Sequence, residues 1–552
     1  MLLAACAGLW TSYHYTFTAW GLDSDSSVFV MLMHGWQNHG WGFFRSWLYT
    51  RDNWLLSSAP LAFLDYKVFG ATGRSVIGLG WAVFAANAFL AATVMRLLLG
   101  RWSPAALVVS CLCLFAGEDT IGSAGAMAFS AFHNATMLWI LLAIMVVFAE
   151  KAKGFFWRPL VLCAIVFIAS LSDPWFNAAC ALPLALVLLW RQRAGKESRR
   201  QNLALLTGLL GGWVLAGTKA FGAFSFLHGY HFHFALNPEQ VLGNLRLYLQ
   251  AIAVLFQAAL VWRWNHAVGV LFVGLSLFLA ANALLWLARP AKQAGNLKGP
   301  ELSLRQRGAL NFFMISSAII SGLFFLYSYD ADAGAGAGRY LINIYYGMLV
   351  LGVFVYAARW VHLTAWMRAA AVVWVLVFIM AGAASNPGAW TKRAKINDLG
   401  AAELAQFLES NGLRYGYGDY WGARANTVSW ISGFRTIVRP VLFHDYQAGP
   451  EGAPVRKYLF FIPRLETSRL WNLDADSKNA GRVFLVLNGN EPFEGNPYVP
   501  IPVLAQTASE EFGKPGQVLQ FQNFTILVWD HPILPALRLG ERIMFRQFSP
   551  PK

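Results

Sequence analysis

Charged residues are scarce in this chain of 552 amino acids. They make up 13% of the sequence, whereas 57% of the residues are hydrophobic and 15% are aromatic. An average soluble protein has about a quarter of its residues charged. The composition therefore excludes an ordinary water-soluble protein and indicates a chain that lipid surrounds over much of its length.

Cysteine is scarce as well, and none follows residue 180. The five cysteines are Cys6, Cys111, Cys113, Cys163 and Cys180. Their spacing is not that of a metal site, and we expect the C-terminal part of the chain to be stable without disulfides. Leu3-Ala4-Ala5-Cys6 is similar to a lipoprotein cleavage box, but no basic region precedes it. We therefore expect the first apolar run to remain as an uncleaved helix.

The sequence also lacks a concentrated basic patch, although its net charge is +15. Its lysines and arginines are dispersed among short loops between apolar runs, a pattern that argues against a nucleic-acid-binding surface. Basic residues placed in this way mark the cytoplasmic loops of a membrane protein. The predicted cytoplasmic groups are Arg96 with Arg101, Lys151 with Lys153, Arg191 to Arg200, Arg305 with Arg307, and Arg359 with Arg368.

Long apolar runs are abundant. Five approach the roughly 20 residues that a helix needs to cross a bilayer. These are residues 76–99, 266–288, 310–328, 340–358 and 366–383. Weaker or interrupted runs are residues 1–20, 104–117, 134–149, 159–172, 176–190, 203–222 and 245–262. Placing every basic group in the cytoplasm requires an odd number of crossings between residues 223 and 288, where we find two runs, so the sequence predicts 11 or 13 transmembrane helices.

The runs divide the chain into two predicted domains. Residues 1–388 form a transmembrane domain with a first periplasmic loop at 21–75, and residues 389–552 form a soluble periplasmic domain. In the first loop, Ser24 or Asp25 can cap a helix that lies along the outer membrane surface. We expect its aromatic residues at the level of the lipid headgroups. They are Trp36, Trp41, Phe43, Phe44 and Trp47.

The C-terminal domain has the pattern of a small α/β or α+β fold. Asn397 or Asp398 can cap a helix that Gly412 ends. Strand-like runs follow at residues 426–431, 457–462, 482–487 and 517–529. No internal repeat is found, and the low-complexity tract is the alternation of alanine and glycine at residues 333–338.

Ionisable residues at the outer ends of the helices are the candidates for chemistry, because such groups are costly to keep at membrane depth. Asp23 and Asp25 follow the first apolar run. The Asp23 carboxylate can accept the proton of an attacking hydroxyl, while Asp25 can orient it or help to bind a divalent cation. The alternative interpretation is that these carboxylates only cap the helix that follows.

Further polar residues are predicted on the same side of the membrane and are candidates for substrate binding. They are Arg51, Asp52, Glu118, Asp119, His133 and Asp173, with Asp330 and Asp332 in the last outer loop. Ordinary loop polarity is the alternative interpretation. Arg339-Tyr340 then enters a helix, and the arginine can bind the phosphate of a lipid head group. A general contact with bilayer phosphates is its alternative role.

Together these features resemble one known superfamily. An Asp-x-Asp at Asp23 and Asp25 after the first span, a juxtamembrane helix, an Arg-Tyr at Arg339 and an exported C-terminal domain are similar to the GT-C superfamily of membrane glycosyltransferases. The stretch from Leu404 to Trp421 (LAQFLESNGLRYGYGDYW) also looks like the start of the soluble domain in bacterial members. The resemblance covers the layout of the whole chain through short motifs.

The resemblance implies a GT-C glycosyltransferase of the bacterial inner (cell) membrane. Such an enzyme takes a hexose or pentose from a polyprenyl-phosphate donor on the periplasmic side and transfers it, with inversion, to an envelope glycan, lipid or protein. The resemblance further implies Asp23 as the catalytic base, Asp25 as its partner, and Arg339 with Tyr340 as the donor-phosphate site. Some members use a divalent cation, for which Asp23 and Asp25 would be the ligands.

Two other functions fit parts of the sequence. A polymerase or ligase that moves oligosaccharides from a polyprenyl-diphosphate carrier would also need outer arginines, but its large outer loop usually lies between late helices. A membrane transporter would place polar residues inside its spans and in repeated halves. Here the carboxylates lie at helix ends and no repeat is found.

Overall fold

The computed structural model describes most of the chain as helices. The described residues are 2–19, 21–50, 52–121, 133–148, 157–192, 196–227, 234, 237–287, 304–328, 334–387, 396–446, 458–463, 468, 470–471, 481–488 and 501–533. The chain divides into two compact units. The helical unit consists of Met1–Trp20, Arg51–Ser225 and Gly229–Ile396, and the mixed unit of Gly21–Thr50, Phe226–His228 and Asn397–Lys552.

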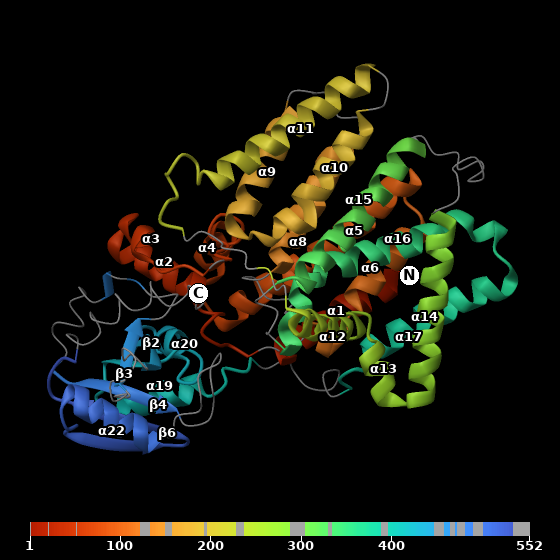
Figure 1. The fold of residues 1–552 in the computed structure, drawn as a ribbon. Coiled ribbons are helices and arrows are strands. Elements are labelled where there is room, and N and C mark those ends of the chain that lie inside the picture. Colours follow the sequence, from red (N-terminus) through yellow and green to blue (C-terminus); the bar gives the residue numbers. More distant parts are fainter. Residues whose placement is uncertain are drawn as a thin grey trace. The chain divides into compact units, whose positions relative to one another are not determined.

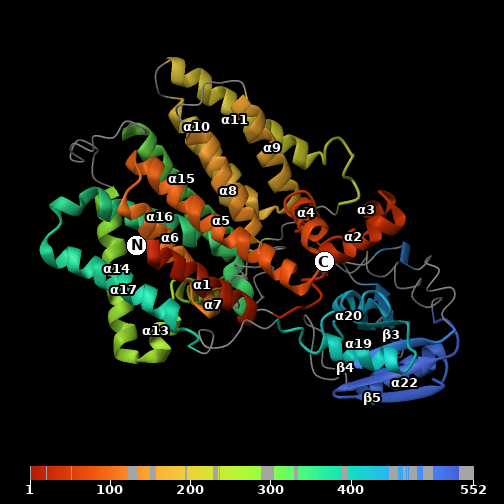
Figure 2. The ribbon, with the colours of Figure 1, turned by 180° about the vertical axis from the view of Figure 1, so that it is seen from behind.

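The helices of the helical unit are drawn in Figures 1 and 2. They are α1 (Leu2–Ala19), α4 (Ala59–Phe69), α5 (Gly73–Leu99), α6 (Pro104–Leu114), α7 (Glu118–Ile121), α8 (His133–Phe148), α9 (Trp157–Ser172), α10 (Leu182–Arg191), α11 (Lys196–Gly217), α12 (Pro238–Leu255), α13 (Ala258–Trp264), α14 (His266–Leu287), α15 (Leu304–Leu326), α16 (Ile342–Arg359) and α17 (Ala365–Ala384). A π-helical turn (Asn177–Ala181) precedes α10, and the 3-10 helices η3 (Gly334–Leu341) and η4 (Trp360–His362) flank α16.

Five described helices are long and apolar enough to cross a membrane. They are Gly73–Leu99, His266–Leu287, Arg307–Leu326, Gly338–His362 and Ala365–Ala384. The five strongest apolar runs in the sequence overlap these helices, which confirms their prediction as helices of spanning length. The weaker runs also lie in helices. One of them, residues 245–262, is divided between α12 and α13, which meet at an angle of 73°.

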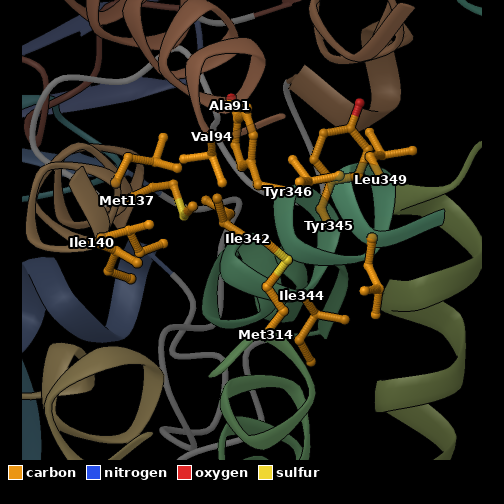
Figure 3. Close-up of a cluster of buried hydrophobic side chains, with 14 of the residues drawn as sticks. Ala91, Val94, Met137, Ile140, Met314, Ile342, Ile344, Tyr345, Tyr346 and Leu349 are labelled. Atoms are coloured by element: carbon orange, nitrogen blue, oxygen red, sulfur yellow. The ribbon is translucent and has the colours of Figure 1, made fainter. Parts of the chain in front are cut away.

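The core of the helical unit includes residues of α5, α8, α15 and α16. Figure 3 shows part of it, with Ala91 and Val94 from α5, Met137 and Ile140 from α8, Met314 from α15, and Ile342, Ile344, Tyr345, Tyr346 and Leu349 from α16. Asn343 donates side-chain hydrogen bonds to the hydroxyls of Ser317 (3.0 Å) and Ser321 (2.9 Å). These bonds tie the first turn of α16 to α15 and so fix the residues that precede it.

Helices α9 and α11 pack so closely that two glycines are required. A Cβ atom at Gly208 would lie 2.3 Å from the carbonyl oxygen of Pro159, and one at Gly212 would lie 2.4 Å from that of Cys163. The spacing of four residues between the glycines is the small-xxx-small pattern of closely packed membrane helices. A side chain at either position would force the two backbones apart.

The bend between α12 and α13 is supported by neighbouring segments. Gln257 has left-handed backbone geometry with φ of 60°, and its side-chain amide donates to the Phe115 carbonyl at 2.9 Å. The Thr120 hydroxyl donates to the Val254 carbonyl, also at 2.9 Å. Non-helical backbone at membrane depth is stable where neighbouring groups satisfy its polar atoms. The bend is therefore stabilised by hydrogen bonds to neighbouring segments of the helical unit.

The mixed unit is organised around a six-stranded sheet, visible from behind in Figure 2. Its strands are β1 (Tyr415–Asp419), β2 (Ile437–Tyr446), β3 (Tyr458–Pro463), β4 (Val483–Asn488), β5 (Gln517–Phe521) and β6 (Phe524–Trp529), in the order β3-β2-β1-β4-β6-β5. Strand β1 is parallel to β2 and β4, and the other pairs are antiparallel. Helices α19 (Ala401–Ser410) and α20 (Ala425–Ile431) bury apolar residues against one face, and α22 (Ile501–Phe512) buries residues against the other.

The sheet confirms part of the sequence prediction. Helix α19 ends before Gly412 as expected, and the runs at 457–462 and 482–487 are β3 and β4. The run at 517–529 is a hairpin of two strands, with Gln522 at φ of 51° in its turn. The strand predicted at 426–431 was wrong, because these residues form α20. They connect the parallel neighbours β1 and β2, and a parallel pair requires a crossover connection rather than another strand.

The predicted first loop is divided between the two units. Residues 21–50 carry α2 (Val28–His39) and α3 (Gly42–Ser46) and lie in the mixed unit, while residue 51 begins a segment of the helical unit. The N-cap of α2 is Ser27, without a side-chain capping bond, so the prediction that Ser24 or Asp25 caps it was wrong.

The aromatic residues of that loop are placed by protein contacts. Phe43 and Trp47 are buried, and their rings lie 6.3 and 5.4 Å from the ring of Trp471. Phe44 is buried too, whereas 75% of the Trp41 surface is exposed. Phe43, Phe44 and Trp47 therefore have their apolar surroundings within the mixed unit, and their position at the level of the lipid headgroups stays a prediction.

Candidate functional site

Five of the predicted site residues lie together in the helical unit. We call Asp52, His133, Asp173, Arg339 and Tyr340 the polar cluster. His133 begins α8, Asp173 directly follows α9, and Asp52 lies in the loop before α4. Arg339 and Tyr340 lie in η3, at the entry to α16. Four segments that are far apart in the sequence thus contribute to one cluster.

Asp173 holds the ring of His133 in position. Its carboxylate is 2% exposed and its Oδ2 accepts a 2.6 Å hydrogen bond from His133 Nδ1. The Thr136 hydroxyl donates to the same oxygen, and the Trp175 backbone N–H donates to Oδ1 at 3.0 Å. Three donors hold this carboxylate in place, and its contact with Nδ1 fixes the orientation of the imidazole ring.

The loop that carries Asp52 is attached to the end of α9. The backbone N–H of Asn53 donates to the Ser172 carbonyl at 2.9 Å, and its side chain donates to the Leu171 carbonyl at 2.9 Å. The N–H of Ser57 donates to the Ser172 hydroxyl at 3.1 Å. Trp54 adopts φ of 43°, an unusual value for a tryptophan, and its ring lies edge-on 5.9 Å from that of His133. Strained backbone of this kind clusters at functional sites.

Asp52 and His133 face each other without touching. The Oδ2 atom of Asp52 lies 4.0 Å from Nε2 of His133, and the Asp52 side chain is 29% exposed. Burial raises the pKa of the Asp52 carboxyl, and the neighbouring Asp173 raises it further, while His133 and Arg339 partly oppose the shift. The cluster thus holds a carboxyl group that accepts a proton more readily than an ordinary surface aspartate.

Arg339 and Tyr340 complete the cluster. The Tyr340 ring lies 4.7 Å from that of His133 and 5.4 Å from that of Trp175. Arg339 Nη2 donates to the Tyr340 hydroxyl at 3.1 Å, and both side chains are half-buried. The cluster therefore combines a guanidinium, which binds anions, with an oriented imidazole and a carboxyl group, which exchange protons.

Asp23 and Asp25 lie in the mixed unit. Asp23 Oδ1 accepts hydrogen bonds from the backbone N–H (2.9 Å) and hydroxyl (2.8 Å) of Ser26. Burial raises the pKa of Asp23, opposed by the bonds from Ser26 and by the charge of Arg424. Asp25 Oδ1 accepts a 2.7 Å bond from the Tyr420 hydroxyl. Both carboxylates are therefore held by named partners within that unit.

The other predicted site residues lie elsewhere. Asp119 forms an ion pair with Arg263 of α13. The backbone N–H of Glu118 donates to the Ser385 hydroxyl at 2.9 Å. Burial raises the pKa of the Glu118 carboxyl. These two residues thus lie near the bend between α12 and α13 and not in the polar cluster. Arg51, Asp330 and Asp332 are outside the described residues.

Thr136 and Trp54 belong to the site but were not predicted from the sequence. Thr136 donates to Asp173, and Trp54 contacts the His133 ring. The signal for Thr136 was its position three residues after His133, which puts both side chains on one face of α8. Trp54 follows Asp52 closely in the sequence, but nothing in the sequence indicates its left-handed backbone.

Neither a cluster of metal-ligating side chains among the described residues nor a similarity to known proteins assigns a function to the polar cluster. Within the described part of the chain, no group of three or more histidine, cysteine, aspartate or glutamate side chains is arranged to hold a metal ion. No protein-family model matches this chain, and no curated protein matches it significantly. The chemistry of the polar cluster is therefore the basis for assigning a function.

Proposed function

We propose that the chain is an inverting glycosyltransferase of the bacterial inner membrane. It moves a sugar from a polyprenyl-phosphate donor to an envelope glycan, lipid or protein on the periplasmic side. The observation that supports this most is the polar cluster, in which Arg339 opens a helix of membrane-spanning length beside His133 and Asp52. A lipid phosphate lies at the membrane surface, where such a helix begins.

The donor phosphate is the expected ligand of Arg339. At about 4 Å and an effective dielectric near 20, the attraction between a guanidinium and a phosphate is about 4 kcal/mol. In a single displacement the acceptor oxygen attacks the anomeric carbon, the bond from that carbon to the phosphate oxygen breaks, and polyprenyl phosphate leaves. Arg339 stabilises the charge that the leaving phosphate gains. The configuration of the sugar is inverted because the displacement occurs once.

The proton of the acceptor hydroxyl is assigned to Asp23, as the resemblance to GT-C enzymes implies. The raised pKa of its carboxyl supports this role, because a general base is most effective when its pKa lies near the working pH. Asp25, held by Tyr420, is its partner.

The bent pair α12 and α13 supports a topology of 11 spans. If the pair enters the membrane and returns to the same side, α14 is the one crossing between residues 223 and 288. The basic loops on either side then all lie in the cytoplasm. The same topology puts the end of α17 and the mixed unit on the periplasmic side. A reporter fused after residue 395 should then be active only outside the cytoplasm.

Substitution of Arg339 tests the proposed function. A short-chain, detergent-soluble polyprenyl-phosphate sugar removes the bilayer from the assay. Arg339→Ala should lower its turnover about 30- to 1000-fold, the loss expected for one anion contact of roughly 2 to 4 kcal/mol. Arg339→Lys keeps the charge without the forked geometry and should retain part of the activity.

The matched control is Arg359, at the other end of the same helix, where it packs over the ring of Trp286. Arg359→Ala should leave turnover of the soluble donor unchanged. Normal turnover in Arg339→Ala would mean that this arginine contacts bilayer phosphates only, and would remove the main support for a polyprenyl-phosphate substrate.

A further inference from the structure

The Nε2 atom of His133 is a buried polar atom without a hydrogen-bond partner among the described residues. The side chain is 3% exposed, and its other nitrogen is held by Asp173. Buried polar groups are nearly always hydrogen-bonded, because leaving one unpaired is costly. An unpaired atom on a ring that is otherwise held in place indicates that a ligand atom completes the site.

The separation between Nε2 and the Asp52 carboxylate matches a bridge through one oxygen atom. Oδ2 of Asp52 lies 4.0 Å from Nε2, and an oxygen placed at about 2.8 Å from both atoms makes an ordinary hydrogen bond to each. Whichever of the imidazole nitrogen and the carboxyl oxygen carries a proton donates to this bridging oxygen, and the other accepts a hydrogen bond from it. A hydroxyl group matches this pair because its single oxygen both donates and accepts.

Aromatic rings surround the same imidazole. Trp54 and Tyr340 contact the His133 ring directly, and Trp175 lies next to Tyr340. Trp175 and Tyr340 are half-buried and so have surface left for a ligand. Apolar walls with a few placed polar groups are typical of small-molecule sites. A sugar ring matches both the apolar walls and the polar groups, since its C–H groups pack on aromatic rings while its hydroxyls need polar partners.

We propose that the polar cluster contains the subsite for the sugar ring of the donor, with one ring hydroxyl bound between His133 Nε2 and Asp52 Oδ2. This inference rests on the proposed function and adds the substrate class, a sugar with a free hydroxyl at one fixed ring position. The donor rather than the acceptor fits, because Arg339, assigned to the donor phosphate, hydrogen-bonds to Tyr340, whose ring contacts His133. His133 and Asp52 are then specificity-determining residues.

Binding of deoxy donors tests the subsite without requiring transfer. The full chain in detergent is titrated with short-chain prenyl-phosphate hexoses and pentoses and with their monodeoxy analogues, and bound donor is measured directly. For the wild type, removal of one particular hydroxyl should weaken binding about 10- to 100-fold, because the site's polar groups are left unpaired. Removal of the other hydroxyls should have a smaller effect.

His133→Asn makes the test specific to one atom. The asparagine amide can still donate to Asp173 but has nothing in the place of Nε2. This variant should bind the full donor about as weakly as the wild type binds the critical deoxy donor, and it should no longer distinguish the two. His266→Asn is the matched control, because it makes the same substitution at an exposed histidine of α14 that lies outside the polar cluster. It should keep the full discrimination.

The outcomes separate the two proposals. Equal binding of all deoxy analogues by the wild type, or full discrimination in His133→Asn, would overturn the subsite while leaving the transferase proposal intact. Discriminating binding without transfer to any acceptor would overturn the transferase proposal and leave the subsite intact. Failure of the wild type to bind any of these donors would overturn both.

Discussion

The side-chain amide of Gln257 donates a 2.9 Å hydrogen bond to the carbonyl oxygen of Phe115, 142 residues earlier in the chain. Phe115 follows α6, and Gln257 lies at the bend between α12 and α13. A Cβ atom at Gly382 would meet the same Phe115 carbonyl at 1.7 Å, so α17 also passes close to this point. The bend therefore rests on two other parts of the helical unit, which favours a fixed re-entrant segment over a loosely broken span.

Cysteine labelling can decide the topology of that segment. Glu239 near the start of α12 and His266 at the start of α14 are both exposed. In a background without Cys6, the exposed native cysteine, Glu239→Cys and His266→Cys should both react with a membrane-impermeant maleimide added to the periplasmic side. His362→Cys, in a predicted cytoplasmic loop, should not react. Reaction of just one of the first pair would show that α12 and α13 form a crossing.

The packing of α9 on α11 should depend on Gly212 and tolerate a methyl group at Gly211. Gly212→Ala forces a methyl group against the Cys163 carbonyl and should destabilise the helical unit by about 1 to 3 kcal/mol. At Gly211 the nearest atom to an added Cβ is Cys163 Sγ at 3.6 Å, an ordinary contact. Gly211→Ala should therefore unfold like the wild type in detergent. Equal melting temperatures for the two variants would contradict the close approach of these helices.

The Asp52 carboxyl should lower the free energy of unfolding at neutral pH. Its raised pKa means that the folded protein holds the proton more tightly than the unfolded chain does, so stability falls as the pH rises through the folded-state pKa. Asp52→Asn removes this loss and should melt at a higher temperature than the wild type at pH 7, with the difference shrinking toward pH 4. Asp173→Asn should instead lower the melting temperature, because three donors need that carboxylate. A destabilised Asp52→Asn at pH 7 would contradict the argument.

The two first-loop aspartates should differ in their effect on transfer. Asp23→Asn removes the assigned base and should lower turnover about 10²-fold or more with little change in folding. Asp25→Asn leaves an amide that can still accept from the Tyr420 hydroxyl and should cost less. Both are measured with saturating donor so that binding does not limit the rate. Full turnover in Asp23→Asn would assign the base elsewhere, with Asp52 as the next residue to test.

The parts of the fold that were predicted correctly depend on local sequence. Spanning-length helices such as Gly73–Leu99 follow from uninterrupted apolar runs, which require no knowledge of distant partners. The strand expected at 426–431 failed because Thr427, Val428 and Ile431 favour strands locally, while the parallel pairing of β1 with β2 requires a crossover there. Pairing between distant segments overrode local preference.

The candidate site shows the same contrast between what local sequence predicts and what depends on distant segments. His133, Asp173 and Asp52 were identified individually, since ionisable residues at the ends of membrane helices are costly and therefore informative. Their grouping was not predictable, because it depends on the attachment of Asn53 to Ser172, more than 100 residues away. The burial of Trp47 against Trp471 depends on a contact across an even longer separation.

The bond between Tyr420 and Asp25 links residues 395 positions apart, and this determines when the mixed unit can be completed. A ribosome adds roughly 5 to 20 residues per second, so Asp25 is made about 20 to 80 s before Tyr420. Over that time the aromatic residues of α2 and α3 have no C-terminal partner. The newly made segment is then exposed to proteases and chaperones in a way that the finished protein is not. A nascent chain stopped at residue 388 should therefore be cleaved within residues 21–50 far faster than the complete chain.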